Sequence, residues 1–153
     1  MLFLVEANEK YTGELAQFKK EVLLYDKNRK VQFAGCMGLR DCSTEKDWIN
    51  LCNLRKRTET CEQAGTTVPS TTYFAIRESD NRLVGVIDLR HHIDHPILGT
   101  WGGHCGYSVR PSERGKGYAN EMLRLNIQNA KRMGLSKLLV VCDETNAASE
   151  KTI

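Results

Sequence analysis

The sequence contains one stretch whose residue types suit it to binding an anion, Arg114-Gly115-Lys116-Gly117-Tyr118-Ala119. Residues 106–109 before it alternate in polarity and include an aromatic side chain, as at the end of a strand. The apolar residues after it recur at helical spacing. Glycines let main-chain N–H groups approach a phosphate, and the first N–H groups of a helix have no partner within it. The stretch therefore predicts a phosphate-binding turn, to which Arg114 and Lys116 add positive charge.

Two other phosphate-binding motifs fit this turn less well. A P-loop, G-x-x-x-x-G-K-[ST], needs a glycine where the chain has Arg110 and a serine or threonine where it has Gly117. The dinucleotide-binding motif G-x-G-x-x-G matches Gly115 and Gly117, but Asn120 occupies its third glycine position. The sequence therefore favours neither motif.

A third pattern matches at every position. Residues 114–119 fit [QR]-x-x-G-x-[GA], and in this they resemble the acyl-CoA pyrophosphate loop of the GNAT N-acyltransferase superfamily. Residues 106–111 resemble the fourth strand of that superfamily, and residues 146–149 resemble the start of its next helix. The resemblance is clear over the second part of the chain and rests on element order alone in the first. It implies a single acyl-CoA N-acyltransferase domain over residues 1–153, with acetyl-CoA as co-substrate.

The resemblance also implies where the cofactor lies. The main chain of the predicted strand pairs with the pantetheine arm like an added strand, the amides of the turn hold the pyrophosphate, and Asn146 lies near the thioester. The expected cofactor-binding residues are Tyr107, Ser108, Val109, Arg114, Gly115, Lys116, Gly117, Tyr118, Ala119 and Asn146.

Acetyl transfer to an amine needs a base, because the amine must be neutral to attack the thioester. The superfamily has no fixed motif for this base, and the strands expected to line the cleft offer Asp88, His91, His92 and His104. We expect His104 to be the base, since the ordinary pKa of histidine suits proton transfer near neutral pH. The alternative is that His104 only makes a hydrogen bond within the sheet.

The general acid has no counterpart in this sequence. Superfamily members often use a tyrosine that follows the position of Asn146, whereas no tyrosine follows Tyr118 here. The cluster His91-His92-x-Asp94-His95 has the residue types of a metal site. Adjacent strand residues point to opposite faces, however, and the superfamily's reaction needs no metal. We therefore expect no metal.

Length and composition place the chain among soluble single-domain proteins. Its 153 residues suffice for one hydrophobic core, and its net charge of +3 is too small to argue for a nucleic-acid partner. No stretch is apolar enough to span a membrane, and residues 2–5 lack the basic segment of a signal peptide. The six cysteines show no C-x-x-C spacing, which favours reduced thiols. We expect a cytoplasmic protein without membrane association.

The remaining elements position the turn. Apolar periodicity predicts a helix over residues 9–24 and another that begins after Ser43 as its N-cap. Residues 71–77 and 83–89, joined by a short polar turn, predict an antiparallel hairpin. Gly134 is expected to end the long helix. With residues 138–142 as a buried central strand, the order is β-α-α-β-β-β-α-β-α, an α/β fold with a mixed, mainly antiparallel sheet flanked by helices.

The predicted strand over residues 138–142 has no later segment to flank it. An uncovered apolar strand recruits another strand through its unpaired N–H and C=O groups. We therefore expect that C-terminal strands are missing from this chain, or else that a second copy covers the edge in a homodimer. The first outcome is favoured, because residues 147–153 begin a helix and then break off.

Two classes of function fit these residues. The favoured one is an enzyme that transfers the acetyl group of acetyl-CoA to a primary amine of a small molecule or a peptide by direct attack. The alternative is a non-catalytic acyl-CoA-binding or regulatory domain. A protein that uses the turn for another nucleotide is a weaker third reading. The acceptor is not specified, because the variable first helices and loops build its site.

Overall fold

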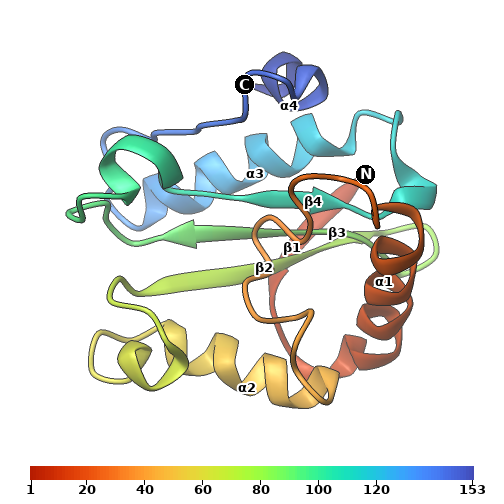
Figure 1. The fold of residues 1–153 in the computed structure, drawn as a ribbon, viewed down its shortest axis with the longest axis horizontal. Coiled ribbons are helices and arrows are strands. Elements are labelled where there is room, and N and C mark those ends of the chain that lie inside the picture. The colour runs from red at the N-terminus through yellow and green to blue at the C-terminus, as the bar shows by residue number, and fades with distance from the viewer.

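The computed structural model describes all 153 residues and contains four strands and four α-helices (Figure 1). In chain order they are β1 (Leu2–Glu6), α1 (Thr12–Tyr25), α2 (Glu45–Arg55), β2 (Ser70–Arg77), β3 (Arg82–Arg90), β4 (Tyr107–Val109), α3 (Tyr118–Arg132) and α4 (Ala147–Thr152). Short 3-10 helices at Glu9–Tyr11, Cys61–Ala64 and Pro111–Glu113 and a π-helical turn at Leu98–Gly102 lie in the connections. The predicted α/β fold class is confirmed.

The strands form one antiparallel sheet in the order β1-β2-β3-β4, so β4 is an edge strand. Helices α1 and α2 cover one face and α3 covers the other (Figure 1). The alternation along β2 explains the two cores, because Phe74 and Ile76 pack with α1 and α2 whereas Ala75 packs with Met122 of α3. The sheet is thus buried on both faces.

Local signals in the sequence set most element boundaries. The predicted hairpin is formed, with Arg77 paired to Arg82 across the turn and Asn81 in the left-handed conformation at φ 55°. Gly134, at φ 89°, follows the last turn of α3 as expected. The predicted N-cap of α2, Ser43, is one residue too early, since Thr44 accepts the hydrogen bond from Asp47 N–H at 3.1 Å.

The prediction of a central strand over residues 138–142 is wrong. The segment pairs with no strand of the sheet. Its main chain accepts one hydrogen bond from the segment before β4, from His104 N–H to Leu139 O at 2.8 Å. Leu138 and Val140 still pack against the core under α3 while remaining half-buried. The apolar side chains of this segment are thus partly covered by the core although the segment is not a strand. All four strands of the sheet are antiparallel, so the sheet is not mixed as predicted.

No helix has both the length and the apolar character that are needed to cross a membrane.

Candidate functional site

The turn between β4 and α3 presents a row of free main-chain donors. Gly115 and Gly117 adopt the left-handed conformation at φ 75° and 81°, and the N–H groups of residues 115–120 have no acceptor within the protein. A Cβ built on either glycine meets no atom within 4 Å. The donors therefore face open space at the N-terminus of a 15-residue helix, where the helix dipole favours an anion.

The strand that leads into this turn has a free edge. Gly106 O accepts from Asp88 N–H at 3.0 Å, and Arg110 N–H donates to Val84 O at 2.8 Å, so these residues pair with β3. Because such pairing alternates along an antiparallel strand, Tyr107 and Val109 turn their main-chain groups to the other edge. No strand lies there. The edge is therefore open to an extended ligand, with Val109 O already bonded to Arg114 Nε at 3.1 Å.

Both basic side chains of the turn are paired with acids. The Arg114 guanidinium donates to the Asp26 carboxylate at 2.6 and 2.5 Å, and Lys116 Nζ lies 2.7 Å from Glu113 Oε2. Burial would raise the pKa of Asp26, but the hydrogen bonds and charge of Arg114 outweigh it and lower the pKa below its ordinary value. The free donors of the turn are thus its amides, and the side chains of Arg114 and Lys116 fix its position.

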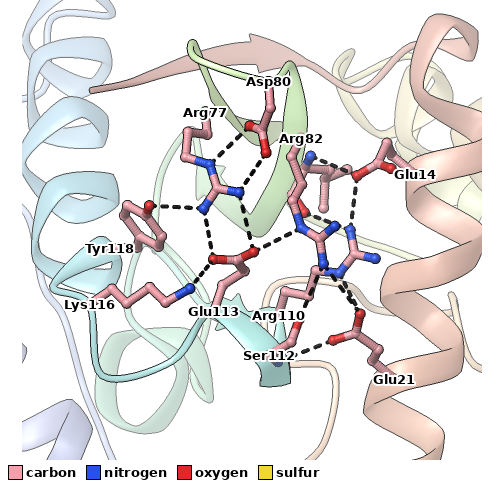
Figure 2. A network of polar contacts seen from close by, with 11 residues as sticks. Glu14, Glu21, Arg77, Asp80, Arg82, Arg110, Ser112, Glu113, Lys116 and Tyr118 are labelled. Atoms are coloured by element: carbon pink, nitrogen blue, oxygen red, sulfur yellow. Dashed lines mark hydrogen bonds and ion pairs between the residues drawn. The ribbon is translucent and has the colours of Figure 1, made fainter.

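An ion-pair network centred on the buried Glu113 anchors the turn to the rest of the fold (Figure 2). Glu113, with only 6% of its side chain exposed, accepts from Arg77 at 2.8 Å and pairs with Arg82 at 2.8 Å. Burial alone would raise the pKa of Glu113, but hydrogen bonds from Lys116 and Arg77 lower it below the ordinary value. The carboxylate therefore stays charged and ties the turn to the hairpin of β2 and β3.

Helix α1 holds the other side of the same segment (Figure 2). Arg110 is buried and donates to Glu14 Oε2 at 2.9 Å and to Glu21 Oε1 at 2.7 Å. The second oxygen of Glu21 accepts from Ser112 N–H at 3.1 Å. Sequence reasoning missed these acids, because their partners lie far away in the chain. Their signal was spacing: Glu14 and Glu21 are seven residues apart, on one face of a helix.

Asn146 lies at the N-terminus of α4, where its side chain accepts from Ser149 N–H at 3.2 Å. Ser149 in turn shares a hydrogen bond of 2.6 Å with the Tyr107 hydroxyl. This contact joins α4 to the strand with the free edge. The structure therefore brings Asn146 to the Tyr107 end of β4, at the opposite end of that strand from the glycine turn.

His104 is buried, and a main-chain group uses one of its ring nitrogens. Nδ1 accepts from Leu139 N–H at 2.9 Å, so the proton of the neutral ring lies on Nε2. Burial, and then the charge of Arg90, lower the pKa of the imidazole below its ordinary value. The ring is thus neutral near pH 7, and its basic nitrogen links the segment around Leu139 to the start of β4.

Asp88 lies beside the same strand start, where its Oδ1 accepts from Gly106 N–H at 2.5 Å. Oδ2 is 3.6 Å from Arg90 Nη2 and has no closer polar partner. Burial raises the pKa of this carboxyl, although Arg90 and the Gly106 amide favour its charged form. One oxygen of Asp88 therefore makes no hydrogen bond within the protein.

The other histidines are used within the loop after β3. His91 Nε2 lies 2.9 Å from Thr71 Oγ1, while His92 and His95 each accept a main-chain N–H two residues ahead. No group of three or more histidine, cysteine, aspartate or glutamate side chains is gathered in a way that could hold a metal ion. Each of the three rings is therefore held by a hydrogen bond of its own.

Known structures share this fold. A Vibrio cholerae protein described as a ribosomal-protein-serine acetyltransferase is 18% identical, covers 99% of this chain and 75% of its own, and superposes with a TM-score of 0.64. A Trypanosoma brucei acetyltransferase is 17% identical, with coverages of 99% and 89% and a TM-score of 0.54. A Clostridium acetobutylicum acetyltransferase, solved with acetyl-CoA, is 18% identical, with coverages of 99% and 87% and a TM-score of 0.51.

Comparison with curated proteins found no match. Comparison with family models matched residues 29–153 to the acetyltransferase (GNAT) domain. That range includes the open edge of β4, the glycine turn and the start of α4. The chain therefore belongs to the GNAT acetyltransferase family.

Proposed function

We propose that this protein transfers the acetyl group of acetyl-CoA to the primary amine of a small molecule or peptide. Acetyl-CoA is the co-substrate of the family. The observation that carries the proposal is the row of unpaired amides at residues 115–120, which continues directly from the free edge of β4. An extended ligand that ends in a pyrophosphate matches both features, because the edge bonds the arm and the amides bond the phosphates.

On this proposal the thioester lies near Tyr107, at the end of β4 that is remote from the glycine turn. The amine nitrogen attacks the carbonyl carbon, a C–N bond forms, the C–S bond breaks, and CoA leaves as the thiolate. Main-chain donors that polarise the carbonyl stabilise the negative charge of its oxygen in the transition state. The amine loses one proton, which a base accepts directly or through water.

Asp88 is the better placed of the base candidates, and His104 is the second. Asp88 on β3 and His104 before β4 both lie beside the start of β4. Nδ1 of His104 already accepts a hydrogen bond, whereas Asp88 Oδ2 makes no hydrogen bond and lies 3.6 Å from Arg90 Nη2. The raised pKa of Asp88 also brings it closer to the pH at which a base works best. His104 then acts as a base only if its ring releases Leu139.

The test is CoA release from acetyl-CoA in the presence of an amine panel. The panel includes small amines and peptides with an N-terminal serine, since one structural neighbour is described as acting on ribosomal-protein serine. Release with at least one amine, together with the mass of the acetylated product, supports an enzyme. Tight CoA binding without release from any amine supports the non-catalytic acyl-CoA-binding alternative.

A further inference from the structure

A hollow of about 520 Å³ lies in the loop that connects α1 to α2. Figure 1 shows this loop, drawn in orange, crossing the face of the sheet that carries α1 and α2. Its wall includes Phe33, Cys36 and Met37. The loop thus lines an open hollow large enough for a small polar group.

The charged side chains around this hollow are all positive. Lys27, Arg29, Lys30 and Arg40 line it, and no aspartate or glutamate does. Lys30 pairs with Asp143 at 3.2 Å, and Arg29 lies 3.7 Å from Asp26, but Lys27 and Arg40 have no acidic partner. Four cations around one concave surface concentrate positive potential there, which attracts anions.

The hollow adjoins the start of β4. Ser108 Oγ donates to Ala34 O at 2.7 Å, and Gly35 packs so closely on Gly106 that a Cβ at residue 35 would lie 2.3 Å from Gly106 O. The loop that lines the hollow is therefore fixed against the start of β4, where the thioester is expected.

Short contacts connect the wall of the hollow to Asp88. Cys36, in that wall, is buried, and the residue before it, Gly35, packs against Gly106. The Gly106 N–H in turn donates to Asp88 Oδ1.

We propose that this hollow binds an anionic group, a carboxylate or phosphate, of the amine acceptor. The proposal rests on the proposed acetyl transfer and narrows the acceptor to molecules that carry negative charge near the amine. The cations of the hollow attract the anionic group of the acceptor and so position it, while the amine of the acceptor reaches the start of β4. The phosphates of the cofactor have a separate set of donors, the amides of residues 115–120.

The experiment measures binding by calorimetry, so it does not depend on turnover. The probes are the tripeptides Ala-Glu-Glu and Ala-Gln-Gln, each titrated into the protein saturated with CoA. The test variant is Lys27→Gln with Arg40→Gln. The control is Lys131→Gln with Lys137→Gln, which removes the same charge from exposed lysines outside the hollow that have no ion-pair partner.

We expect wild type and the control to bind Ala-Glu-Glu at least about tenfold more tightly than Ala-Gln-Gln. The test variant should lose most of this preference and keep its affinity for CoA. Equal binding of the two peptides to wild type, or no binding of either, overturns the proposal.

A second titration compares CoA with 3′-dephospho-CoA. If the test variant weakens CoA but not 3′-dephospho-CoA, the hollow binds the 3′-phosphate of the cofactor, and the acceptor proposal is overturned. Failure of the proposed function looks different, because it appears as absence of CoA release with every amine, whichever peptide binds.

Discussion

At the scale of single residues, the proposed phosphate site depends on two glycines in a conformation that other residues rarely adopt. Gly117 has φ 81°, and its missing side chain leaves the space in front of the amides empty. Gly117→Val both strains the backbone and fills this space. We expect CoA to bind at least about tenfold more weakly, or about 1.4 kcal/mol, by calorimetry.

The control for this substitution is Gly65→Val. Gly65 has φ 78° and equally open surroundings, but it ends the 3-10 helix Cys61–Ala64 instead of lining the turn. It carries the same backbone strain without contact to the ligand. Equal affinity of folded Gly117→Val and Gly65→Val for CoA would contradict the assignment of the turn.

The base is the second prediction at this scale. Asp88→Asn keeps an oxygen that can accept the Gly106 N–H but removes the basic group, so kcat should fall about a hundredfold while CoA affinity stays unchanged. His104→Asn keeps an acceptor for Leu139 N–H, and kcat should stay within about threefold of wild type. The measurement is steady-state kinetics with saturating acetyl-CoA. The reverse ranking of the two variants would identify His104 as the base.

At the scale of elements, Glu113 joins the hairpin of β2 and β3 to the glycine turn (Figure 2). Glu113→Gln leaves Arg77, Arg82 and Lys116 without their shared carboxylate. Because these cations are partly exposed, we expect a loss of about 2 kcal/mol in the free energy of unfolding. Asp80→Asn is the control. Asp80 pairs with Arg77 at the exposed edge of the network, so this substitution should change the free energy of unfolding only slightly. Denaturant unfolding measures both.

The effect of Glu113 depends on pH in a defined direction. Its pKa in the folded protein lies below the ordinary 4.5, so the carboxylate stabilises the fold above that pH. This contribution is lost as the pH falls through the lower, folded value. The difference between wild type and Glu113→Gln should therefore shrink under acid conditions, and a difference that stays constant down to pH 2 would argue against the ion pairs as its source.

His104 connects the segment around Leu139 to the start of β4. Its lowered pKa means that the folded state binds the proton more weakly than the unfolded state. The neutral ring therefore contributes fully to the free energy of unfolding above the ordinary pKa of 6.5, and this contribution falls as the pH drops toward and through the lower, folded value. Protonation also removes the acceptor for Leu139 N–H. We expect the protection of the Leu139 amide against hydrogen exchange to decrease between pH 7 and pH 5, and in His104→Asn to stay constant over that range.

At the scale of the whole molecule, local patterns predicted most of the architecture. The glycine turn, the hairpin and the helices were predictable because their signals lie within a few residues of one another. Residues 138–142 were wrongly predicted as a strand. An apolar run indicates that its side chains are buried, but it does not indicate whether its main chain pairs with another strand.

The sequence predicts the main-chain donors of the candidate site, but it does not predict the acidic residues that hold the turn in place. The residue type of Gly115 and Gly117 indicates a left-handed conformation. Asp26, in contrast, lies 88 residues from Arg114 in the sequence, and only the fold brings these two residues together. The pairing of Arg114 with an acid therefore had no signal near the turn, whereas Lys116 pairs with Glu113 three residues before it. The positive hollow was equally hidden, because its cations are spread along an irregular loop.

The proposed acetyl transfer requires that the turn after β4 be an acyl-CoA site. Calorimetric titration of the wild-type protein with CoA, ATP and NAD tests this most directly, since the three ligands share a phosphate chain but only CoA has a pantetheine arm for the free edge of β4. We predict that CoA binds at least about tenfold more tightly than either nucleotide. Affinity for ATP or NAD equal to or greater than that for CoA would contradict the account.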